Sequence, residues 1–412
     1  MALLFLATSP PRRLAAQVSV HAQAIPLLTR AWHTPGDKTL TEFALAQPAV
    51  MVEWSTKDPG AEMGMPMPGA RLSLRLTLDG EGITIPDGEL SPGSHGEGFY
   101  DRRHPHTYVH EIMAIGTDLL GAHDGGLDLT VAAGKGFVAF GSDDPMSRPV
   151  VRYPVNHHLA QILERGMVLG AASYGPVSLE ATWFSGDEPT KPSDWPNTWE
   201  RGLDSRAFRF TVHPLPGLEA QYSWARVKSP EHRPGAGPTQ RKRDASVRWS
   251  GALASRPTYL MAEWGRTEEA NGFFHFYTAL VEGAMTLGRH HPYARYERTD
   301  RPEETRTTDP FRSVRPHLDD SNIGITRWSI WSAGYGVSLL TAQGRLEVRP
   351  FVEGSLAHAR ALTGIYDPET AYGSDVLPSV TLGVRMDWGG MSRMRMGRYL
   401  TSPDHSDQME HH

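Results

Sequence analysis

The stretch from Gly96 to Glu111 concentrates side chains that bind metal ions or carry charge. Within sixteen positions it holds imidazole, carboxylate and guanidinium groups: Asp101, Arg102, Arg103, His104, His106, His110 and Glu111. A histidine pair, His157 and His158, follows in another polar stretch. Imidazoles that converge with carboxylates can complete a three- or four-ligand site for zinc or copper. These five histidines are therefore candidate metal ligands.

The same stretch has a second interpretation that needs no metal. Charged loops that fold into a pore decide which solutes pass. Ion pairs would hold such a loop in place, and the sequence supplies their members: Asp101, Arg102, Arg103, Glu111, Asp143, Asp144, Arg148 and Arg152. We favour such a constriction and keep metal binding as the alternative.

Three methionines spaced two residues apart, Met63, Met65 and Met67, form a separate candidate metal segment. A second group of methionines and histidines lies near the end of the sequence: Met391, Met394, Met396, His405, Met409, His411 and His412. Thioethers suit Cu(I), and imidazoles add capacity for Cu(II). If these methionines are ordinary apolar filler instead, the protein needs no cofactor. Copper and zinc are the candidate ions.

Strands must position these groups, because apolar and polar residues alternate along much of the chain. Between residues 70 and 79 every second residue is a leucine, and similar alternation occurs at 346–353 and 376–388. A period of two predicts a strand with one apolar and one polar face. Charged residues on the polar faces are the candidate pore lining: Arg71, Arg75, Glu347, Arg349 and Arg385.

The rhythm of these strands predicts a single closed antiparallel transmembrane β-barrel, which is an all-β fold. The chain holds about sixteen strand-like runs, in keeping with the even strand numbers of bacterial membrane barrels. Tight connections such as Gly175-Pro176 alternate with long ones such as 186–205. Short periplasmic turns and long external loops are typical of this architecture. One short helix is expected at 156–165, because a capping Asn156 precedes apolar residues at helical spacing.

Length and composition favour one exported domain. Across 412 residues no linker separates two composition regimes. We expect a degenerate or truncated signal segment at 1–16, the barrel at 17–388 and a polar Met/His-containing tail at 389–412. The net charge of -6, without a basic stripe, argues against a nucleic-acid partner. The absence of cysteine excludes disulfides and thiolate metal sites.

Enzyme motifs are missing from the sequence. It contains no Gly-x-Ser-x-Gly elbow, no phosphate loop, no dinucleotide fingerprint and no His-Glu-x-x-His helix. Ser94, His95 and Asp101 lie close together, but a catalytic triad is defined by its geometry and not by proximity in sequence. We therefore expect no enzyme.

In its strand rhythm, the chain from residue 17 to 388 resembles the outer-membrane β-barrel proteins of Gram-negative bacteria. The resemblance implies a porin-like passive channel for small solutes or ions, with the lipid bilayer as a partner and a homo-oligomer as one assembly. The run of Met63, Met65 and Met67, with the Met/His tail, is similar to the copper-resistance outer-membrane family, which implies a metal-handling barrel as the alternative. A soluble periplasmic β-protein with a histidine metal site is the third hypothesis.

Overall fold

The computed structural model describes most of the chain. The described residues are 16–56, 70–85, 106–120, 126–143, 147–150, 160–189, 191–230, 235–304, 322–342, 346–389 and 396–400. Three of the predicted site residues in the opening stretch, at 101–103, lie outside these ranges, as do His104, His157, His158, Met63, Met65 and Met67.

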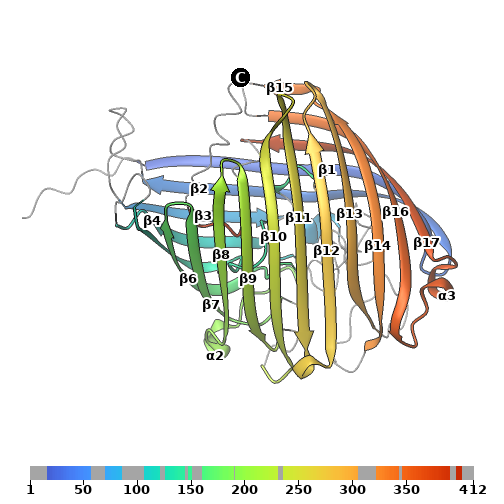
Figure 1. Ribbon diagram of the computed structural model, residues 1–412, viewed down its shortest axis with the longest axis horizontal. Coiled ribbons are helices and arrows are strands. Elements are labelled where there is room, and N and C mark those ends of the chain that lie inside the picture. Colours follow the sequence, from blue (N-terminus) through green and yellow to red (C-terminus); the bar gives the residue numbers. More distant parts are fainter. Residues whose placement is uncertain are drawn as a thin grey trace, which may run out of the picture.

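Antiparallel strands make up nearly all of the fold (Figure 1). They are β1 Ala16–Thr34, β2 Lys38–Thr56, β3 Arg71–Asp79, β4 Val109–Thr117, β5 Asp128–Gly136, β6 Arg165–Tyr174, β7 Val177–Phe184, β8 Ser205–Leu215, β9 Leu218–Lys228, β10 Thr239–Leu253, β11 Arg256–Glu269, β12 Phe274–Met285, β13 His290–Glu304, β14 Asn322–Val337, β15 Leu340–Ala342, β16 Leu346–Gly364 and β17 Val376–Trp388.

The sheet closes on itself, because β1 pairs with both β2 and β17. Every other strand pairs with its neighbours in sequence, except that β14 and the short β15 both pair with β16. β14 and β15 therefore act as one interrupted strand. Counted in this way, the 17 strands of the sheet form a sixteen-stranded barrel. The predicted closed barrel of about sixteen strands is confirmed.

Helices are few and short among the described residues. They are α1 Glu81–Thr84, α2 Thr198–Arg201, α3 Pro368–Tyr372 and the 3-10 turn η3 Ala270–Gly272. None of them has the length and apolar character needed to cross a membrane. The helix expected at 156–165 is wrong for 160–165: the carbonyl of Ile162 accepts a hydrogen bond from Val138 N at 3.0 Å, and Arg165 begins β6. Residues 151–159 lie outside the described ranges.

Alternation along the strands separates an apolar outer face from a polar interior, as predicted. On β3, Leu74 and Leu78 are 56% and 44% exposed, whereas Thr77 and Asp79 are buried. On β17, outward Leu382 alternates with buried polar residues in the same way. Exposed leucines and valines on the outside and buried charges inside are the reverse of a soluble core, and this pattern suits a wall that faces lipid.

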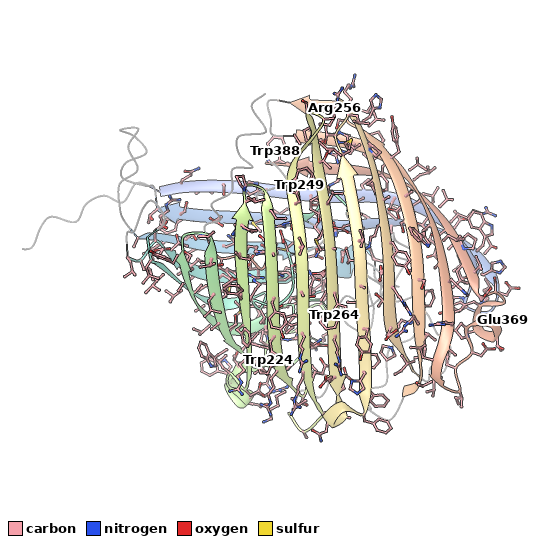
Figure 2. All side chains as sticks on the ribbon, viewed as in Figure 1. Trp224, Trp249, Arg256, Trp264, Glu369 and Trp388 are labelled. Carbon is pink, nitrogen blue, oxygen red and sulfur yellow. The ribbon has the colours of Figure 1, made fainter. Side chains whose placement is uncertain are left out.

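Aromatic side chains mark the two ends of this wall. Figure 2 shows Trp249 and Trp388 toward the end that carries the tight turns, and Trp224 and Trp264 toward the opposite end. Aromatic girdles at the two membrane interfaces are a feature of transmembrane barrels. The apolar band therefore lies between two aromatic borders.

Candidate functional site

The connection between β5 and β6 enters the barrel instead of staying outside it. We call its described residues, 137–143, 147–150 and 160–164, the inner segment. Phe137 and Phe140 are at most 3% exposed. Backbone N–H groups of the inner segment donate to inward side chains of the wall: Gly141 N to Ser223 Oγ at 2.9 Å and Ser142 N to Glu263 Oε1 at 3.2 Å. The inner segment is thus fixed to β9 and β11.

Arg148 anchors the inner segment through charge. Its guanidinium nitrogens lie 3.7 Å from Glu263 on β11 and 3.7 Å from Glu282 on β12. Its carbonyl accepts a hydrogen bond from Arg385 of β17 at 3.0 Å. Burial acts to lower the pKa of Arg148, but the charges of Glu263 and Glu282 outweigh it and raise the pKa. Arg148 is therefore a permanent cation that links the inner segment to β11, β12 and β17.

A second polar cluster joins the inner segment to residues 396–400, which we call the tail segment. Asp143 accepts from Arg248 of β10 at 2.6 Å and from Arg398 of the tail segment at 3.0 Å. Glu219 of β9 accepts from the same two arginines, at 3.0 and 2.7 Å. Burial acts to lower the pKa of Arg398, but Glu219 and Asp143 outweigh it and raise the pKa. Two acids and two arginines thus form one closed ionic network.

The tail segment is buried inside the barrel. Met396 and Tyr399 are at most 3% exposed. The Tyr399 hydroxyl accepts from Phe137 N and donates to Phe137 O, each at 3.0 Å. Arg209 of β8 forms a double hydrogen bond with Glu180, at 2.6 and 2.8 Å, and also donates to Gly397 O at 2.8 Å. Part of the predicted polar tail therefore returns into the interior.

Two histidines of the opening stretch are described, and both are buried beside acids. His106 Nδ1 lies 3.0 Å from Glu81 Oε2, and His110 Nδ1 lies 2.5 Å from Glu164 Oε1. Ligand atoms of Asp79, Glu81 and His106 all lie within 4.8 Å of one another. Carboxylates and an imidazole at such spacing could hold a divalent cation.

Neighbouring charges set the protonation states of His106 and Glu164, which both lie outside the strands. Burial would lower the pKa of His106, but its hydrogen bond to Glu81 and the charge of Glu81 raise it to about 10. Burial would raise the pKa of Glu164, but the charge of His110 lowers it to about 2. The side chains of Thr107 and Lys135 are hydrogen-bonded to each other beside this cluster. Both His106 and Glu164 are therefore charged near neutral pH.

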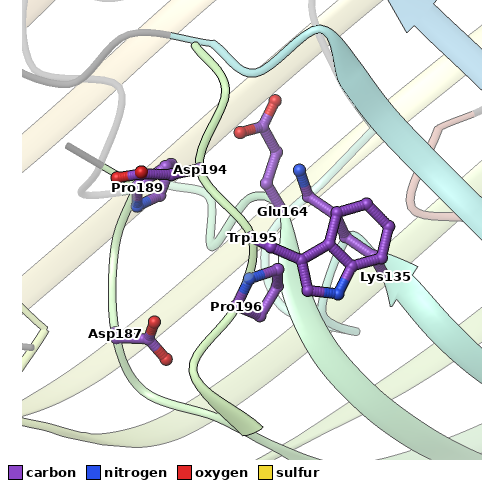
Figure 3. Close-up of a pocket in the computed structure, with 7 residues that line it drawn as sticks. All are labelled: Lys135, Glu164, Asp187, Pro189, Asp194, Trp195 and Pro196. Atoms are coloured by element: carbon purple, nitrogen blue, oxygen red, sulfur yellow. The ribbon is translucent and has the colours of Figure 1, made fainter. Parts of the chain in front are cut away.

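A small, mostly enclosed hollow lies next to Glu164 (Figure 3). Lys135 Nζ lies 5.3 Å from the centre of the Trp195 ring, a cation–π distance. Asp187 and Asp194 also line the hollow. Cationic, acidic and aromatic groups thus meet where the inner segment joins β6.

The other predicted lining residues point inward but do not form one cluster. Arg75 donates to Glu53 at 2.8 Å and lies 3.8 Å from Glu111. Arg349 pairs with Glu347 at 2.6 Å. Arg71 lies at the start of β3, 3.6 Å from Asp118, and Arg385 pairs with Asp387 at 2.9 Å.

Most of the stretch Gly96–Glu111, where a constriction is expected, is not described. Glu111 belongs to wall strand β4, because it continues the alternation of that strand, and residues 96–105 lie outside the described ranges. Among the residues that the structure describes, the β5–β6 connection and the tail segment lie in the interior. Sequence reasoning missed most members of its ionic network: Arg209, Glu219, Arg248, Glu263, Glu282 and Arg398. Alternation alone could have identified the strand residues as inward, but not Arg398.

Comparison with known proteins places this geometry among porins. Neither a protein-family model nor a curated protein sequence matches the chain. An anion-selective porin from Comamonas acidovorans aligns with a TM-score of 0.51 and 9% identity, over 91% of this chain and 100% of that chain. Pseudomonas putida OprB aligns with a TM-score of 0.50 and 10% identity, over 90% and 94%. Vibrio cholerae OmpT, an outer membrane protein in its trimer form, aligns with a TM-score of 0.50 and 9% identity, over 91% and 100%. The chain therefore has the porin fold, the closed antiparallel β-barrel of bacterial outer membranes.

Proposed function

We propose that this protein is a porin-like passive channel for small solutes or ions in the bacterial outer membrane. The observation that carries the proposal is the charged interior, in which the inner segment is held across the barrel by Arg148, Glu263 and Glu282. Charged rings and inward loops set permeability in barrel channels. The porin fold and the apolar outer band support the same location and role.

We infer further that the channel prefers cations. Among the described residues, buried acidic side chains outnumber buried basic ones. A pore wall with an excess of acids concentrates cations and repels anions. The porin from Comamonas acidovorans, described as anion-selective, would then share the fold but not the preference.

Conductance across a planar lipid bilayer tests both statements. The full-length protein, refolded in detergent, should insert and give stepwise current. Under a potassium chloride gradient, the reversal potential should have the sign of potassium preference. Heat-denatured protein is the control. Insertion without current would contradict the channel, and a reversal potential of the opposite sign would contradict cation preference alone.

A metal-associated barrel is the second candidate function. It rests on Asp79, Glu81 and His106, whose ligand atoms lie together at the end of β3 and before β4. Oxygen and imidazole ligands suit zinc better than Cu(I). We expect chelator-treated protein to bind about one zinc ion per chain, which displaces the proton of His106 and leaves a fourth position open, and we expect Asp79→Asn to lose it. Equal zinc uptake by the variant would exclude this site. It would not bear on the channel proposal, which the conductance measurement tests separately.

We propose that the protein assembles as a homo-oligomer. The support is the porin fold, since OmpT of Vibrio cholerae was solved in a trimer form. Chemical crosslinking in detergent before heating should give a ladder of multiples of the chain. A single band at the mass of one chain would contradict the proposal.

A further inference from the structure

A group of arginines projects from the outside of the barrel, where lipid is expected. We call it the arginine ladder: Arg206 of β8, Arg226 of β9, Arg241 and Arg243 of β10, and Arg266 of β11. The residues on either side of each are buried, for example Ala225 and Val227 at 0% and 1% exposure. Since side chains alternate across a strand, the ladder arginines must face outward.

The strand register sets these arginines directly against one another. Arg206 is opposite Arg226, and Arg226 is opposite Arg241. On the next pair of strands, Arg243 is opposite Arg266. Side chains directly opposite in an antiparallel pair have Cβ atoms about 4.5–5.5 Å apart, and like charges there are destabilising. Three such arginine pairs side by side would be stabilised by an anion bound between them.

Acidic side chains of the protein neutralise only part of this positive charge. Glu268 pairs with Arg266 at 2.8 Å and is opposite Arg241 in the register. Among the described residues, the structure gives no ion pair to Arg226, Arg241 or Arg243. Arg206 lies 5.9 Å from the centre of the Trp224 ring and Arg266 lies 5.4 Å from that of Tyr277, contacts that orient a guanidinium without neutralising it.

The ladder lies at the edge of the apolar outer band. Along the same strands the outward positions nearer the tight turns are apolar or aromatic: Phe208, Phe210, Tyr222, Trp224, Val247, Trp249, Leu260 and Trp264. Phe208 and Trp224 stack with ring centres 5.6 Å apart, next to Arg206 and Arg226. Figure 2 shows Trp224 and Trp264 in the half of the wall away from the tight turns. In membrane proteins, aromatic residues followed by cationic ones lie at the depth of the lipid headgroups. The arginine ladder is therefore expected at that depth.

We propose that the arginine ladder binds the phosphorylated headgroup of an anionic membrane lipid in the leaflet at this end of the barrel. Guanidinium groups bind phosphate oxygens through paired hydrogen bonds. The ladder crosses three strand gaps, or about 14 Å at about 4.8 Å per gap, which is wide enough for a headgroup with two phosphates. Acyl chains of the same lipid would lie along the apolar band below it.

The proposal is tested by lipid retention on the full-length protein in detergent. Diphosphorylated lipid A is the probe, and phosphatidylcholine, which is zwitterionic, is the comparison. Native mass spectrometry should show lipid A retained on the wild type and phosphatidylcholine lost. The double variant Arg226→Gln/Arg241→Gln should weaken lipid A binding at least tenfold. Arg327→Gln is the matched control, because Arg327 is already paired with Asp300 at 2.6 Å.

Thermal unfolding separates a lipid site from a simple loss of fold. Without lipid the double variant should unfold at the same temperature as the wild type or higher, because repulsion is relieved. Lipid A should raise the unfolding temperature of the wild type and of Arg327→Gln, but not of the double variant. Equal lipid A binding by the double variant would overturn the proposal. Displacement of lipid A by equimolar inorganic phosphate would also overturn it, because a free anion would then suffice.

Discussion

His106 and His110 show how much of a single residue's role could be predicted from the sequence. The sequence identifies His106 and His110 as functional candidates, but their partners Glu81 and Glu164 lie far from them along the chain. A histidine that is a metal ligand and a histidine that pairs with a buried acid look the same in sequence. Only the fold decides which acids converge, so the candidate residues were predictable and their partners were not.

The charge of Glu164 makes the stability of the inner segment depend on pH. Its pKa is lowered from 4.5 to about 2, so its stabilising effect is complete above pH 4.5 and is lost as the pH falls through about 2. Glu164→Gln should therefore be less stable than the wild type at pH 7, and the difference should vanish toward pH 2. Urea unfolding in detergent, followed by circular dichroism, measures this. The exposed Glu369→Gln is the control, and a pH-independent difference would contradict the assignment.

Arg148 is the residue on which the proposed constriction by the inner segment depends. Arg148→Ala would leave Glu263 buried without its cation and Glu282 with Arg295 as its remaining one; breaking a buried pair costs about 3–5 kcal/mol. We expect the inner segment to detach, the single-channel conductance to rise and the preference for cations to strengthen. Arg289→Ala, which alters an exposed arginine on a tight turn, should leave all three unchanged. Unaltered conductance in Arg148→Ala would show that the inner segment does not limit the current.

At the scale of elements, the strands were predictable and the segments inside the barrel were not. Strands carry a period of two, which each of them displays without reference to its neighbours. The tight turns also carry local signals, such as Gly175 at a φ of 55°. The inner segment and the tail segment have no period, and their stability comes from contacts such as Arg398 with Glu219, 179 residues apart. Long-range ionic contacts leave no local pattern to find.

The tail segment depends on one hydroxyl for its docking on Phe137. Tyr399→Phe removes a group that both accepts from and donates to that backbone. An unsatisfied buried backbone group costs about 1–3 kcal/mol, so the tail segment should leave the interior more often. Trypsin should then cleave after Arg398 faster in Tyr399→Phe than in the wild type, as measured by mass spectrometry. The exposed Tyr335→Phe should not change the rate, and equal rates in all three would contradict the docking.

The whole barrel depends on an outer surface that prefers lipid to water. In a soluble β-protein, Val247 and Leu253 of β10, which are 50% and 56% exposed, would both accept arginine at little cost. In a bilayer the cost depends on depth: about 2–4 kcal/mol at the midplane and about 0–1 kcal/mol near the interface.

Val247→Arg should therefore make folding into lipid vesicles less favourable, by about 2–4 kcal/mol if Val247 lies near the midplane. Leu253→Arg, beside the tight turn of Ala254 and Ser255, should change it little. The same pair of variants in detergent micelles, which deform around a charge, should differ less than in vesicles. Because the two substitutions share strand, face and chemistry, only a membrane explains a difference between them. Equal folding free energies in vesicles would mean that this face does not span a bilayer.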